Sequence, residues 1–217
     1  MIWLLSLVIG LLVSFAAVVF RLSIDLVQEI WLHNASESVA TAAAREPWYV
    51  ILLAPTIGGL VVGILLYYLL PARRAGGVAD VIEARAAGGR NIELRPGLGS
   101  AFVSAISLGS GASAGREGPM VHLGATIATS ICQIFDFPAW ARRTLLACGV
   151  ASAVSASFNA PIAGVLFAHE VVLQHYSKRA FIPIVISSVA GSIISRLQFG
   201  EDAAFTIPDY QITSYLE

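Results

Sequence analysis

The stretch Gly109-Ser-Gly-Ala-Ser-Ala-Gly-Arg-Glu-Gly-Pro-Met-Val-His-Leu-Gly124 places a charged pair, Arg116 and Glu117, inside an otherwise apolar sequence. Glycines surround the pair, and Pro119 follows it. Because glycine and proline interrupt helices, we expect one apolar helix to end near Ser110 and another to begin near Pro119. The break between them then falls at membrane depth, where free backbone groups are tolerated only inside protein or beside a cavity.

A helix that begins at this break offers a positive site for an anion. The first N–H groups of a helix have no acceptor within it, and the helix dipole is positive at that end. Ionisable residues at membrane depth are costly to bury and are usually functional. The residues therefore predict an intramembrane anion site with the carboxylate of Glu117 at its mouth. The alternative left open by the pattern alone is a structural pair of Glu117 with Arg116.

The composition excludes an ordinary soluble domain. Of the 217 residues, 57% are apolar and only 12% are charged, and the mean hydropathy is +0.77. Soluble domains are roughly 25% charged, so we expect an all-α polytopic membrane protein. The net charge of −1 suggests no nucleic-acid partner. Cys132 and Cys148 lie in apolar runs and are expected to be free buried thiols, and the sequence indicates no cofactor and no metal site.

Two stretches are long enough to cross a bilayer. Met1–Phe20 is almost entirely apolar and is expected to continue as a helix to about Trp31, without the basic start of a signal peptide. Trp48–Leu70 is the second span, with aromatic residues near both ends. The loop that follows it is rich in arginine: Arg73, Arg74, Arg85, Arg90 and Arg95. This loop should be cytoplasmic, and counting back across two spans places the N-terminus in the cytoplasm too. We expect an integral protein of the plasma (inner) membrane.

The rest of the chain is expected to form short apolar helices interrupted by glycine and proline. The expected segments are Gly76–Ala87, Leu98–Leu108, Pro119–Phe135, Arg142–Ser157, Ile162–Leu173 and Phe181–Leu197. Such segments are typical of transporters whose broken helices converge near the bilayer midplane. We expect one transmembrane domain over residues 1–217.

Two motifs resemble a known family. Gly115-Arg-Glu-Gly-Pro119 resembles the filter segment of the CLC chloride channels and chloride/proton antiporters, and Phe158-Asn-Ala-Pro-Ile-Ala-Gly-Val-Leu-Phe167 looks like a later helix of that family. The likeness covers about Trp48 to Phe199. Members of the family contain two inverted repeats with broken, tilted helices, and they form homodimers with one anion pathway in each subunit. The resemblance implies that this chain corresponds to the N-terminal repeat only, as a fragment or split subunit that needs a second repeat.

The resemblance also implies roles for individual residues. Glu117 would gate the transport of chloride or a similar anion, with membrane lipid around the subunit. Backbone would line an outer site at Gly115, Arg116, Glu117, Gly118 and Pro119, and a central site at Gly76, Gly77 and Val78. Gly76 stands where the family has an anion-binding serine, and His122 stands where it usually has glutamine. Arg116 is expected to shape the local field, and His122 to be a hydrogen-bonded packing residue.

The residues implied for a proton path are incomplete. Glu170 matches a common glutamate of the family, but Val171 stands where antiporters often carry a second one. Glu170 and His169 are the nearest titratable candidates, because an imidazole titrates near neutral pH. On a helix neither side chain points in the direction of Val171. We therefore expect weak or absent proton coupling.

Two other functions fit parts of the sequence. Gly111-Ala-Ser-Ala-Gly115 matches the nucleophile elbow of serine hydrolases, with Ser113 as the nucleophile of an intramembrane serine peptidase. That motif needs a strand before it and a helix after it, whereas membrane helices flank it here. The second alternative is a non-conducting structural half-subunit, because one repeat supplies only part of a pathway. The favoured interpretation is anion transport without enzyme activity.

Overall fold

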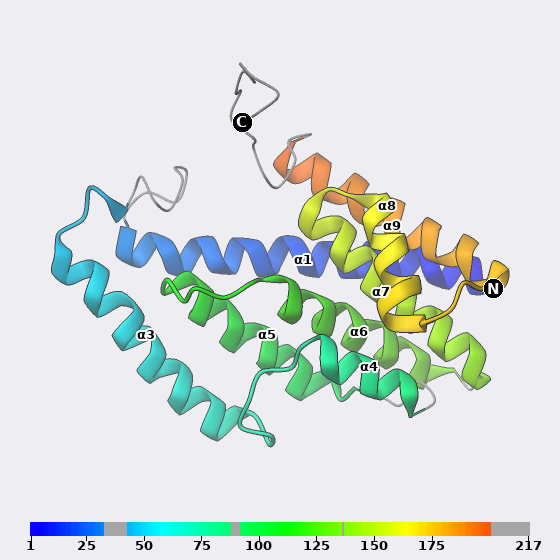
Figure 1. Ribbon diagram of the computed structural model, residues 1–217, viewed down its shortest axis with the longest axis horizontal. Coiled ribbons are helices and arrows are strands. Elements are labelled where there is room, and N and C mark those ends of the chain that lie inside the picture. The colour runs from blue at the N-terminus through cyan, green and yellow to red at the C-terminus, as the bar shows by residue number, and fades with distance from the viewer. Residues whose placement is uncertain (33–42, 88–91, 136, 201–217) are drawn as a thin grey trace, which may run out of the picture.

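The computed structural model describes residues 1–32, 43–87, 92–135 and 137–200, which form helices and loops without a strand (Figure 1). The helices are α1 (Ile2–Leu32), α3 (Trp48–Leu69), α4 (Val78–Ala86), α5 (Leu94–Gly109), α6 (Glu117–Ile134), α7 (Ala139–Phe158), α8 (Pro161–Phe167), the π-helix η1 (Ala168–Leu173) and α9 (Lys178–Phe199). Within these residues, α1, α3 and α9 are long and apolar enough to cross a membrane. The predicted all-α architecture is confirmed, and the two predicted spans are α1 and α3. Arg90 lies outside the described residues.

The helix break predicted at the charged pair is present, with a shift at one end. α5 ends at Gly109, but α6 begins at Glu117, ahead of the Pro119 start that the sequence predicts. A proline is tolerated in the first turn of a helix, because the N–H that it lacks would have no intrahelical acceptor there. Pro119 therefore lies inside the first turn of α6 instead of marking its start.

The segment predicted as one helix over Ile162–Leu173 is divided in two. Asn159 ends α7 in the left-handed conformation, with φ of 54°, and Pro161 opens α8 as a first-turn proline. After Phe167 the backbone widens into the π-helix η1. A π-helical turn changes the directions of the side chains that follow it, and such turns are frequent at functional sites.

α1, α7 and α9 pack side by side and run in the same direction. At Gly10 of α1, an added Cβ would stand 2.8 Å from the carbonyl oxygen of Ser187 in α9, and farther along Arg21 lies 3.9 Å from the ring centre of Phe199. Serine hydroxyls of α9 donate to carbonyls of α7 in matching order: Ser187 to Cys148 at 2.8 Å, and Ser195 to Ala156 at 2.8 Å. Small residues and such hydrogen bonds are typical of close contacts between membrane helices. The N-terminal ends of α1 and α9 thus lie at one end of the molecule (Figure 1).

α6 and α7 form the centre of the fold, and α3 lies at its edge. An added Cβ on Gly124 would stand 2.5 Å from the Gly149 carbonyl oxygen, so the two helices touch backbone to backbone. Cys132 and Cys148 are both buried free thiols, as predicted. α3 lies at the edge of the bundle in Figure 1, where Gly58 packs against Ser110 at the end of α5, and it leaves most of its apolar side chains exposed, with Leu60 66% exposed. An exposed apolar helix of this length is suited to contact with lipid.

Candidate functional site

Small residues shape the loop that brings the chain into α6. The Ser110 hydroxyl donates to the Ile106 carbonyl at 2.7 Å at the end of α5. Gly111 then adopts φ of +92°, a left-handed conformation that favours glycine. The chain turns here and enters α6 at Glu117. The segment predicted as the outer anion site, residues 115–119, therefore forms the start of α6.

The N–H groups at the start of α6 have no acceptor among the residues that the structure describes. Those of residues 115–118 donate to no acceptor in the described part of the chain, and no side chain caps the helix. Glu117 is half-buried, and its carboxylate folds back over Gly115, where an added Cβ would overlap Oε2 and stand 3.2 Å from Cδ. Free donors at the positive end of a helix can bind an anion, and Glu117 places its own carboxylate beside them.

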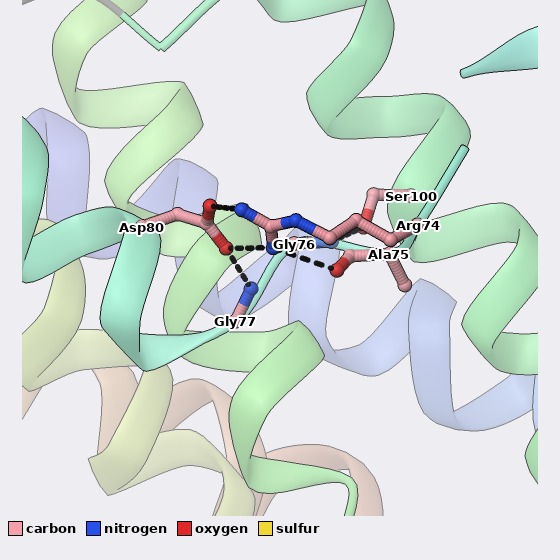
Figure 2. Close-up of polar contacts among 6 residues, drawn as sticks. All are labelled: Arg74, Ala75, Gly76, Gly77, Asp80 and Ser100. Atoms are coloured by element: carbon pink, nitrogen blue, oxygen red, sulfur yellow. Dashed lines mark hydrogen bonds and ion pairs between the residues drawn. The ribbon is translucent and has the colours of Figure 1, made fainter. Parts of the chain in front are cut away.

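The segment predicted as the central site, residues 76–78, forms the start of α4, and its first N–H groups are already engaged. The Gly76 N–H donates to the Ser100 hydroxyl at 2.7 Å, and the Gly77 N–H donates to Asp80 Oδ2 at 2.8 Å (Figure 2). Asp80 thus caps its own helix by reaching back from the third position of the first turn. The N–H of Val78 donates to no described residue.

An ion pair fixes this cap. Arg74 donates to both carboxylate oxygens of Asp80, at 2.5 Å from Nη2 and 3.0 Å from Nη1 (Figure 2). The hydrogen bond from Arg74 lowers the pKa of Asp80 below its ordinary value of 3.8, and the Gly77 N–H adds to that effect against the opposing effect of burial. Asp80 therefore remains ionised at neutral pH and neutralises part of the positive start of α4.

The fold brings the two predicted segments together. An added Cβ on Gly118, at the start of α6, would stand 4.0 Å from the Gly77 Cα at the start of α4. Glycine at both positions allows the two backbones to approach this closely. The starts of two helices thus converge, as the sequence predicts for broken membrane helices.

His122 occupies the space beside Gly76. An added Cβ on Gly76 would stand 2.5 Å from Cε1 and 2.6 Å from Cδ2 of the imidazole, so the ring fills the side-chain position of residue 76. The ring is only 7% exposed, yet neither nitrogen forms a hydrogen bond with a described residue. The prediction of a packing residue is correct, but the predicted hydrogen bond is absent among these residues. Sequence reasoning missed the contact with Gly76, although the family resemblance in the sequence marks both positions as departures.

Arg116 turns its side chain toward α7. Its Nη2 donates to the Ser157 carbonyl at 3.3 Å, and the guanidinium shares a small cavity with Arg21 of α1. The side chain is thus held by the neighbouring helices while the backbone remains at the start of α6. This placement is consistent with the expectation that Arg116 shapes the electric field near the start of α6.

The residues considered for a proton path lie on η1. His169 is fully buried, its ring stacks on Tyr176 at 5.3 Å between centroids, and its Nδ1 lies 3.3 Å from the His175 carbonyl oxygen. Glu170, the next residue, is exposed. The two candidates are thus neighbours on the π-helix, but one is buried and the other is exposed. The hydrogen bond of His169 leads to the end of η1 and not to Glu117.

The hydrolase alternative finds no support in the local structure. Ser113 is exposed in the loop between α5 and α6, so a helix precedes it where the nucleophile elbow needs a strand.

Comparison with known proteins identifies the family. The family model described as "Voltage gated chloride channel" matches residues 58–217. This chain belongs to the voltage-gated chloride channel (CLC) family. A relative in Ralstonia nicotianae, "Putative chloride channel protein ClcB-like", is 35% identical, covering 95% of this chain and 49% of the relative. "Voltage-gated ClC-type chloride channel ClcB" of Escherichia coli is 33% identical, covering 92% of this chain and 48% of that protein.

Solved CLC structures share the fold. A "slow cyanobacterial Cl-/H+ antiporter" superposes with a TM-score of 0.75 at 21% identity, covering 99% of this chain and 50% of that one. A "CLC-type fluoride/proton antiporter" gives a TM-score of 0.73 at 27% identity, covering 99% of this chain and 51% of that one. The chain thus spans about half the length of the CLC proteins that it matches, and the predicted CLC-type fold is confirmed.

Proposed function

We propose that this chain supplies the N-terminal half of a CLC-type pathway for chloride or a similar small anion. The free N–H groups of residues 115–118 carry the proposal, because they form an anion site at the start of α6. Glu117 acts as the gate: its carboxylate competes with the anion and leaves when it is protonated or displaced. The names of the two superposed antiporters, one for chloride and one for fluoride, support a small halide as the substrate class.

His122 serves this pathway as the side chain that faces the start of α4. Gly76 offers no hydroxyl, and the imidazole fills the place where one would stand. Neither ring nitrogen is engaged by a described residue, and a ring N–H can donate to an anion. Residues 76–78 therefore contribute the wall of the central site, and His122 contributes its side-chain donor.

The working protein is an integral membrane homodimer that includes a second repeat, with the N-terminus in the cytoplasm. Val171 cannot carry a proton. Of the neighbouring titratable residues, His169 is buried and Glu170 is exposed, so the two do not form one continuous proton path. Transport is therefore weakly coupled to protons or uncoupled, and the chain has no enzyme activity.

The test compares this chain alone with a completed subunit, made by joining it to the half of the Ralstonia nicotianae relative that it does not match. Chloride efflux from liposomes is measured for both. Efflux is expected from the completed subunit and not from the chain alone. A folded completed subunit without efflux would favour the structural half-subunit, and labelling of Ser113 by a fluorophosphonate would favour the peptidase.

A further inference from the structure

A basic cavity lies away from the proposed anion pathway. It has a volume of about 240 Å³ and lies between the start of α7, the end of η1 and the start of α9. Three of its lining residues are Arg143, His175 and Arg179, and no aspartate or glutamate among the described residues lines it. A cavity with this charge selects against cations and favours an anionic ligand.

Most side-chain donors in this cavity have no acceptor among the described residues. The Nε of Arg143 is buried and has no hydrogen-bond partner, and neither its guanidinium nor that of Arg179 donates to a described residue. The Nδ1 of His175 forms a hydrogen bond with the Leu173 carbonyl oxygen at 2.8 Å, and its Nε2 remains available for a ligand. The buried Nε of Arg143 is unfavourable without an acceptor, and the exposed Arg179 and His175 add free donors beside it, so these groups indicate a ligand that accepts hydrogen bonds.

The start of α9 adds backbone donors. Ser177 precedes the helix without a side-chain cap, and it lines the cavity. The N–H groups of Lys178 and Arg179 donate to no described residue. A helix start beside two arginines has the donor set that binds phosphate oxygens, because guanidinium pairs with phosphate in a planar, two-bond geometry.

The position of the cavity suggests where the phosphate comes from. α9 and α1 run in parallel, so the cavity lies at the N-terminal end of α1, which the arginine distribution predicts to be cytoplasmic. Trp140, which is 53% exposed, lines its rim as aromatic residues do at the headgroup level. We propose that this cavity binds a phosphate group at the cytoplasmic membrane surface, carried by an anionic phospholipid or free in solution.

The test measures lipid retained by the purified chain, by native mass spectrometry, during titration with dioctanoyl phosphatidylglycerol. The double variant Arg143→Gln with Arg179→Gln should weaken binding by about tenfold or more, since charge-assisted hydrogen bonds to phosphate are lost. The matched control is Arg142→Gln with Arg95→Gln, which removes the same charge from residues that do not line the cavity. The control should bind like the parent chain.

A second arm adds inorganic phosphate to the lipid-bound chain. Displacement of lipid would identify free phosphate as a ligand of the site, and retention would identify the phospholipid; both outcomes support the site. Equal losses in the two double variants, or no loss in either, would overturn it. Arg179→Gln alone, at an exposed residue, provides the same readout if the double variant does not fold. None of these measurements depends on chloride transport.

Discussion

The starts of α4 and α6 are both rich in glycine, but they differ in how many backbone N–H groups they leave without an acceptor among the described residues. At α4, Gly76 and Gly77 donate to Ser100 and Asp80. At α6, the N–H groups of residues 115–118 have no partner among the described residues. α4 thus keeps only part of its N-terminal donors available, such as the Val78 N–H, whereas α6 leaves the N–H groups of four successive residues available to an anion. We therefore propose that an anion binds first at α6, with α4 as the supporting wall.

The largest effect should come from filling the space beside α4. In Gly76→Ala the new Cβ overlaps the buried His122 ring, which must move, so we expect a loss of about 1–3 kcal/mol in stability. The measurement is the melting temperature in detergent micelles. Adding His122→Ala should recover part of the loss by removing the ring. Full stability of Gly76→Ala alone would show that the ring does not occupy this space.

A smaller effect should come from removing the cap of α4. Asp80→Asn weakens the bonds to Gly77 and Arg74, at an expected cost of about 0.5–1 kcal/mol at pH 7. Because folding lowers the pKa of Asp80, its contribution is complete above pH 3.8 and is lost as the pH falls through the lowered pKa.

The melting temperatures of the parent chain and Asp80→Asn should accordingly differ at neutral pH and converge in acid. Glu83→Gln, at an exposed position of the same helix, is the control and should follow the parent chain. A difference that persists unchanged below the lowered pKa would contradict the ionised cap.

The smallest effect on stability is expected at the start of α6. In Gly115→Ala the new Cβ meets the flexible carboxylate of Glu117, which can swing away, so stability should change by less than about 0.5 kcal/mol. Displacing the carboxylate should nevertheless weaken the pH dependence of chloride efflux from the completed subunit. An unchanged pH profile would argue against a gate at this position.

Local signals in the sequence were sufficient for the main elements. Apolar length predicts α1 and α3, and the glycines around Arg116 and Glu117 predict the break between α5 and α6. The start of α6 was misplaced because Pro119 is acceptable anywhere in the first turn. The π-helix within Ile162–Leu173 was missed because apolar periodicity does not distinguish it from an α-helix.

The site was predictable only in part. The motif indicates residues 115–119, but the contact between Gly76 and His122 joins residues far apart in the sequence and depends on how α4 packs against α6. The cap by Asp80 involves residues close in the sequence, but residues 76 and 77 also match the segment predicted to bind an anion. Only the hydrogen bonds of their N–H groups show that these donors are already engaged.

The most direct test of the central claim is chloride efflux from the completed subunit as a function of pH, for the parent sequence and for Glu117→Gln. A neutral amide cannot compete electrostatically with an anion at the positive start of α6. We predict pH-dependent efflux for the parent, and fast efflux independent of pH for Glu117→Gln. A Glu117→Gln variant that keeps the pH profile of the parent would contradict the claim that this carboxylate gates the site.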